Sequence, residues 1–80
     1  MNPPLKYRAL LAGDVGRLLH VEAGTVKRMV QRGDLVPTWI SSGRYIFAWG
    51  DLVIQAKRLD RFLAPIEILD DDPDEGEVGE

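Results

Sequence analysis

The spacing of apolar residues predicts a short helix near the start of the chain. Over about Ala12–Leu19 the apolar positions recur at i, i+3 and i+4, as on the buried face of a helix. These positions are Val15, Leu18 and Leu19. Gly16 lies inside this stretch, where a glycine costs about 1 kcal/mol relative to alanine, so we expect it to let a second helix approach closely. His20 is expected to end the helix.

The same pattern predicts a second helix from residue 22 or 23 to residue 31, stopped by Gly33. Its apolar side is formed by Val26, Met29 and Val30. Glu22, at the start, is a poor capping residue, so we expect the helix to be less firmly started. The faces that the apolar side leaves free carry five polar or basic residues, Thr25, Lys27, Arg28, Gln31 and Arg32.

Residues 35–49 have the composition of two β-strands around a turn, rich in aromatic and β-branched residues. The turn 41–44 contains Gly43, which suits the positive φ of a tight hairpin. We expect Phe47, in the second strand, to lie in the core. A third helix is predicted from about Gly50 to Leu63, stopped by Pro65. The fold expected is mainly α with a small β-hairpin.

Charge divides the chain into two parts. Residues 1–64 hold all ten basic residues and five acids, which gives +5, whereas residues 65–80 hold eight acids and no base, which gives −8. Because acid, proline and glycine concentrate at the end, we expect a lead-in at 1–9, a folded domain at 10–64 and a disordered acidic tail at 65–80. The tail either competes with an anionic ligand for the basic domain or only keeps the protein in solution.

Composition also excludes several functions. The chain has no cysteine, a single histidine and no nucleophile–base pair, phosphate-binding glycine loop or metal cluster in its sequence. We therefore predict a binding module, not an enzyme, with no catalytic residue, metal or cofactor. The apolar run near the start is too short for a signal peptide or a membrane span, which predicts a cytoplasmic protein that does not bind membranes.

Four features of the sequence follow one another in a specific order and spacing. Thr25-Val26 in the second helix is followed by a Gly33-x-Leu35 stop, then by the glycine-tipped hairpin, and then by Asp51-Leu52 at the opening of the last helix. In this order, residues 10–63 resemble the winged helix-turn-helix DNA-binding domains of the MerR-like and phage excisionase families.

The resemblance implies that the second helix enters the major groove of double-stranded DNA, while the hairpin, as a wing, reaches the minor groove or the backbone. The contacts it implies are Thr25, Lys27 and Arg28 to base edges or phosphates, Arg17 and Arg32 to phosphates, and Arg44 at the tip of the wing. Gln31 shares the exposed face of the helix. A plain solvated helix face is the alternative interpretation of these polar residues.

The second strand differs from the arginine-rich strand typical of these families, because it is mostly apolar. So small a domain cannot easily bury all of its apolar residues here, which are Trp39, Tyr45, Ile46 and Trp49. An exposed apolar patch among them would serve a protein partner or self-association. The third helix is too short for the dimerising coiled coil of full-length MerR-type regulators, and nothing follows it that senses a small-molecule effector.

Two functions follow from these observations. The first is an excisionase-type or small transcriptional regulator that binds DNA cooperatively, with recombination and transcription regulation both open as its process. The alternative is a winged-helix protein-interaction module that uses its aromatic wing, for example a phage component such as a small terminase-like subunit. If the chain is phage-encoded, the expected location is the host cytoplasm.

Overall fold

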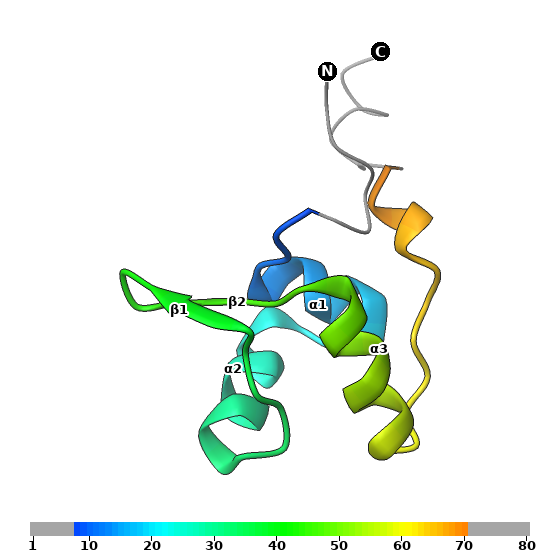
Figure 1. Ribbon diagram of the computed structural model, residues 1–80. Coiled ribbons are helices and arrows are strands. Elements are labelled where there is room, and N and C mark those ends of the chain that lie inside the picture. The colour runs from blue at the N-terminus through cyan, green and yellow to red at the C-terminus, as the bar shows by residue number, and fades with distance from the viewer. Residues whose placement is uncertain (1–7, 71–80) are drawn as a thin grey trace.

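The computed structural model describes residues 8–70, which form three α-helices, one 3₁₀-helix and a two-stranded antiparallel hairpin (Figure 1). In chain order the elements are α1 (Ala12–Leu19), α2 (Ala23–Arg32), β1 (Trp39–Ser41), β2 (Arg44–Ile46), α3 (Trp49–Arg58) and η2 (Ile66–Asp70). The predicted order of two helices, a hairpin and a third helix is confirmed. The predicted lead-in, except its last two residues, and the part of the predicted tail beyond residue 70 lie outside the described residues. Within 8–70, no helix has the length and apolar character needed to cross a membrane.

A tight turn joins α1 to α2, and Gly16 makes it possible. His20 adopts the left-handed conformation (φ 61°) and ends α1, and its N–H bonds to the carbonyl of Gly16. The N–H of Val21 bonds to the same carbonyl at 2.8 Å. A Cβ on Gly16 would lie 2.5 Å from the carbonyl oxygen of Val21. The predicted role of Gly16 is confirmed, and the close contact is with the backbone of the turn.

The ends of α2 follow the sequence signals closely. Glu22 is the N-cap residue and makes no side-chain capping bond, in agreement with the poor cap expected there. Gly33 is left-handed (φ 87°) at the other end, where its N–H bonds to the last carbonyls of the helix. The helix therefore reaches Arg32, one residue further than expected.

The hairpin closes through a two-residue turn. Ser42 and Gly43 both have positive φ, 52° and 77°, as a type I′ turn requires, although only Gly43 was expected to. The register pairs Trp39 with Ile46, Ile40 with Tyr45 and Ser41 with Arg44. Beyond β2, Phe47 and Leu10 exchange two backbone hydrogen bonds of 2.8 and 2.9 Å, which tie the chain before α1 to the hairpin.

The third helix is shorter than predicted. It ends at Arg58 instead of about Leu63, because Asp60 adopts a positive φ of 55° and reverses the chain. The N–H of Asp60 bonds to the carbonyl of Lys57, and the N–H of Arg61 bonds to that of Ala56, which is a Schellman end. The chain then runs back toward the start of α3 (Figure 1). Pro65 is therefore not the residue that stops the helix.

The predicted disorder from residue 65 onward is wrong for residues 65–70. Here η2 places Ile66 and Leu69 in the core, with exposed fractions of 6% and 4%. The guanidinium of Arg17 donates to the carbonyl of Ile68 at 3.0 Å and holds η2 on α1. The i, i+3 spacing of the two buried residues matches the 3₁₀ repeat, but the acidic composition of the segment obscured it. The folded body therefore includes residues 65–70.

The core lies where the three helices meet the base of the hairpin. Phe47 is completely buried, as predicted. Among residues 8–70 it is the largest of eight fully buried side chains; the others are Leu10, Leu18, Met29, Leu35, Leu52, Val15 and Val26. Leu59 and Leu63, which were assigned to the third helix, pack on this core from the segment after it. The core holds α2 from one side only, so the other side faces solvent.

Candidate nucleic-acid interface

The exposed side of α2 carries two parallel rows of long polar side chains. Lys27 and Gln31 are four residues apart and form one row, and Arg28 and Arg32 form the next, about 100° further around the helix. All four are exposed. Thr25 is half-buried beside the second row. The side of α2 that the sequence left free of apolar residues is therefore a continuous polar surface.

An open groove of about 390 Å³ separates the first row from the hairpin. Three segments line it: Leu11, Ala12 and Gly13 at the start of α1, Ala23, Lys27 and Gln31 on α2, and Gly43, Arg44 and Tyr45 on the hairpin. The structure thus brings together Lys27, Gln31 and Arg44, three of the residues predicted from sequence.

The lining of this groove favours an anionic ligand that accepts hydrogen bonds. Lys27 and Arg44 supply two positive charges from opposite walls, and in the described part of the chain no acidic residue lines the groove. Charges of one sign on the walls of a concave surface reinforce each other's field. Gln31, between them, has both a donor and an acceptor. The groove therefore combines electrostatic attraction with a side chain able to recognise a hydrogen-bonding pattern.

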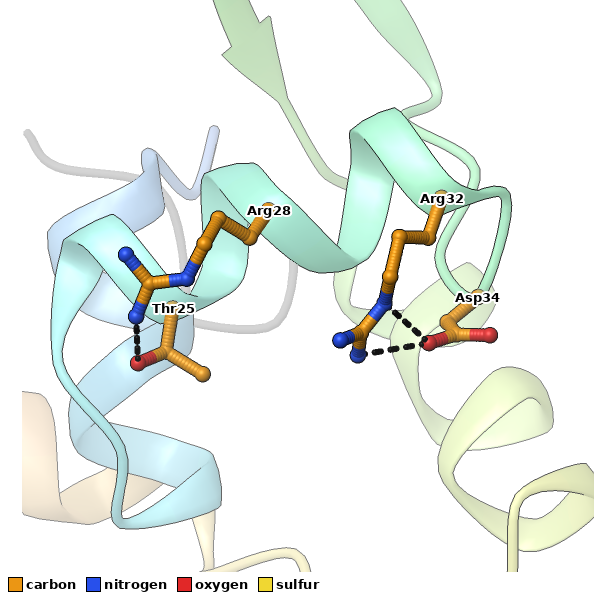
Figure 2. A network of polar contacts seen from close by, with 4 residues as sticks. All are labelled: Thr25, Arg28, Arg32 and Asp34. Atoms are coloured by element: carbon orange, nitrogen blue, oxygen red, sulfur yellow. Dashed lines mark hydrogen bonds and ion pairs between the residues drawn. The ribbon is translucent and has the colours of Figure 1, made fainter.

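The second row on α2 is held by intramolecular partners (Figure 2). The Nη2 of Arg28 donates to the Oγ1 of Thr25 at 3.1 Å, which folds the guanidinium back toward the start of the helix. Arg32 donates from Nε and Nη2 to one oxygen of Asp34, Oδ2, at 3.2 and 2.9 Å. Arg28 therefore keeps its net charge, whereas that of Arg32 is balanced by a carboxylate.

Arg17 has a different place from the one predicted. Its guanidinium bonds to the carbonyl of Ile68, a residue 51 positions further along the chain. It is not part of the groove lining. Because only the folded chain brings η2 to α1, no local sequence signal distinguished this structural arginine from a phosphate-binding one.

Two polar clamps fix the hairpin to α3, and sequence reasoning missed both. The hydroxyl of Thr38 donates to Oδ2 of Asp51 at 2.7 Å and accepts the N–H of Ala48 at 2.9 Å. The side-chain amide of Gln55 bonds to both the N–H and the carbonyl of Val36, at 2.7 and 2.9 Å. These bonds set the position of the hairpin, and so of Arg44, relative to the helices.

The predicted apolar surface of the hairpin is only partly exposed. Trp39 is 56% exposed, but Tyr45 and Trp49 are half-buried and pack against the core, and Ile46 is also half-buried. Ile40, which was not predicted, is the most exposed large apolar residue of the described chain, at 66%. The expectation that these four residues are not all buried is confirmed at Trp39, whereas the other three lie near the base of the hairpin, within reach of the core.

The basic residues that follow the hairpin in the chain lie outside the groove. Lys57 and Arg58, at the end of α3, and Arg61, just after it, are exposed and are not part of the groove lining. His20 is exposed and contacts the ring of Phe62, with 4.9 Å between ring centroids. No three His, Asp or Glu side chains among residues 8–70 come together as a metal site would require.

The side chains on α2 and the hairpin are the basis on which a function is assigned. Comparisons with protein-family models, with curated proteins and with solved structures found no match to this chain. A function therefore has to follow from the groove and from the polar surface of α2.

Proposed function

We propose that this protein binds double-stranded DNA as a winged helix-turn-helix domain, with α2 in the major groove and the hairpin, as the wing, at the minor groove or the backbone. The observation that carries this proposal is the groove that Lys27 and Gln31 of α2 share with Arg44 of the hairpin, where none of the lining residues within 8–70 is acidic. A ligand that enters it contacts the helix and the wing together.

The dimensions and side chains of α2 suit a major groove. An α-helix with its side chains is about 10–12 Å across, close to the width of the major groove, about 12 Å. Its exposed side offers Lys27, Arg28, Gln31 and Arg32. Arginine can donate two hydrogen bonds to guanine, glutamine can pair with adenine in the same way, and lysine binds phosphate oxygens. These are the side-chain types that base and backbone contacts need.

Arg28 is the residue we assign to base contact. In helix-turn-helix proteins, residues near the start of the recognition helix contact base edges. Arg28 folds back toward that end, where Thr25 holds one of its nitrogens. A guanidinium that is already oriented loses less conformational freedom when it binds. Arg44, at the tip of the hairpin, is assigned to the minor groove or the backbone.

A single copy should bind weakly, which supports an excisionase-type or small-regulator mode of action with several copies along the DNA. Few cations face the groove, and α2 begins at Glu22 without a side-chain cap. Each phosphate contact adds only a modest, salt-dependent increment of affinity. Contacts between neighbouring copies through the exposed Trp39 and Ile40 would supply the cooperativity.

The proposal is tested with a fluorescent duplex of random sequence. Binding should be detectable at about 50 mM salt and should weaken with a slope of about −0.9 per neutralised phosphate in a plot of log affinity against log salt. Lys27→Gln and Arg44→Gln should each reduce the magnitude of this slope by about 0.9. Arg61→Gln removes the same charge from an exposed residue outside the groove and should change the slope less. Absence of binding at low salt, or an equal effect of all three variants, contradicts the proposal.

The exposed apolar residues of the hairpin favour a second candidate, a protein-interaction module such as a phage assembly component. Trp39 and Ile40 are more than half exposed, and exposed apolar patches mark interfaces. In that case Trp39→Ser and Ile40→Ser would abolish self-association or partner binding, measured by analytical ultracentrifugation, while the Lys27 and Arg44 variants would have no effect.

A further inference from the structure

The two arginines of the second row on α2 have acceptors of different charge. Arg28 donates to the neutral hydroxyl of Thr25, whereas Arg32 donates through two nitrogens to the carboxylate of Asp34 (Figure 2). The Arg32–Asp34 pair is an ion pair of 2.9 Å. A duplex that approaches α2 therefore meets one arginine with its full charge and one whose charge is already balanced.

The position of Asp34 is set by the backbone and does not depend on the ion pair. Gly33 ends α2 in the left-handed conformation, and the N–H of Asp34 then bonds to the carbonyl of Met29 at 2.8 Å. This turn fixes the backbone of Asp34 just beyond the last residue of α2, a position from which its carboxylate reaches the Arg32 guanidinium. The pair is thus built into the end of the helix.

The pair is also accessible enough to be opened. The side chains of Arg32 and Asp34 are 65% and 43% exposed, and ion pairs between exposed side chains are weak. A bidentate contact between an arginine and guanine in a desolvated major groove is stronger than such a pair. A single phosphate contact in a loose, solvated complex is not stronger than the ion pair. Such a contact would also bring the Asp34 carboxylate close to other phosphates, which repel it.

We propose that Asp34 is a specificity-determining residue of the DNA interface. By holding Arg32, it keeps that arginine from adding a phosphate contact on arbitrary sequence, and it releases Arg32 only where the duplex offers a better acceptor. This inference rests on the proposed function, because it assumes that the exposed side of α2 binds DNA. Asp34 does not itself contact the duplex and acts through Arg32.

The test is Asp34→Asn, which keeps the size of the side chain and removes its charge. The variant should bind a fluorescent random-sequence duplex about threefold to tenfold more tightly at low salt, with a salt slope steeper by about 0.9, the increment for one more phosphate. On a duplex obtained by in vitro selection with the wild-type protein, the gain should be smaller. The ratio of specific to random affinity should therefore fall.

Two controls separate this mechanism from a general effect of charge. Glu22→Gln removes one negative charge at the other end of α2, where the carboxylate makes no capping bond, and should leave the slope unchanged. In an Arg32→Gln background, Asp34→Asn should have no effect, because there is no arginine to release. Equal thermal midpoints would show that Asp34→Asn leaves the fold intact.

Each outcome supports or overturns a defined part of the proposal. If the wild-type protein does not bind random duplex at low salt, the proposed function fails, and the role of Asp34 fails with it. If the wild type binds but Asp34→Asn has the same affinity and slope, only the role of Asp34 is overturned. A gain that persists in the Arg32→Gln background is a general charge effect and also overturns it.

Discussion

Among single residues, Gly16 most directly controls how α2 is positioned relative to α1. A Cβ there would lie 2.5 Å from the carbonyl oxygen of Val21 and 3.3 Å from the backbone nitrogen of Ala23. Both are backbone atoms at the start of α2, so relief requires the turn itself to move. Gly13, in the same helix, has no atom within 4 Å of its hypothetical Cβ. The two glycines therefore form a matched pair.

Gly16→Ala should destabilise the protein by about 1–3 kcal/mol, the typical cost of overpacking a filled site. Gly13→Ala should be neutral or should stabilise it by up to about 1 kcal/mol, because alanine is the better helix former. Urea unfolding measures both free energies. A Gly16→Ala protein as stable as Gly13→Ala would show that the turn yields freely.

Thr38 has a comparable role for the hairpin. Its hydroxyl joins the N–H of Ala48 and the carboxylate of Asp51 at the base of the hairpin. Thr38→Val keeps the shape of the side chain but leaves the N–H of Ala48 without this partner, so it should cost about 1–3 kcal/mol in urea unfolding. Ser41→Ala, which removes an exposed hydroxyl on β1, is the control and should lower the free energy of unfolding much less. Equal losses would contradict the role of Thr38.

Residue-level features were predictable where the cause is local. Gly43 in the turn and the missing cap at Glu22 depend on neighbours within a few positions, so the sequence was sufficient. Thr38 and Gln55 bond to residues 10 to 19 positions away, and Arg17 to one 51 positions away. Such contacts exist only once the elements have packed, so residue type and spacing could not identify them.

At the scale of elements, α1, α2 and the hairpin were predictable because each carries both a periodic apolar pattern and a stop signal. The end of α3 was not, because Leu59 and Leu63 continue the helical spacing although the helix ends at Arg58 and the chain reverses at Asp60. An apolar side chain can be buried whether its backbone is in a helix or in a loop. The period therefore overestimated the length of the helix.

The element that sequence reasoning missed, η2, should contribute directly to stability. Ile66→Ala and Leu69→Ala remove buried side chains and should each lower the free energy of unfolding by about 2–5 kcal/mol. Glu67→Ala, on the exposed side of the same helix, should change it by less than about 0.5 kcal/mol. Guanidinium unfolding would measure this contrast. If Leu69→Ala unfolds at the wild-type midpoint, η2 is not part of the cooperative unit.

At the scale of the whole molecule, the candidate site is assembled from α1, α2 and the hairpin. Residue types on α2 and at the hairpin tip were enough to nominate Lys27, Gln31 and Arg44, because exposed basic and amide side chains are visible in a sequence. Their convergence on one groove depends on the packing of three elements. The balance of the Arg32 charge by Asp34 was equally invisible, although the two residues are only two positions apart.

The residues that follow the described part of the chain carry a large negative charge. Residues 71–80 contain six acids and no base, so a chain that ends at Asp70 has a formal net charge of +3 instead of −3. The boundary predicted from sequence, after residue 64, is unsuitable for this test, because removing Ile66 and Leu69 would damage the core. Ending at Asp70 keeps η2, so the free energy of unfolding should remain near that of the full chain.

If the six acids compete with DNA for the basic surface, the protein that ends at Asp70 should bind random duplex more tightly at about 50 mM salt. The difference should shrink as salt rises toward about 1 M, where the Debye length is about 3 Å. A full-length variant with the six acids replaced by Asn and Gln keeps the chain length and should match the shorter protein. Equal affinity of all three proteins at low salt would leave solubility as the role of these acids. Tight binding by the shorter protein alone would point to chain length instead of charge.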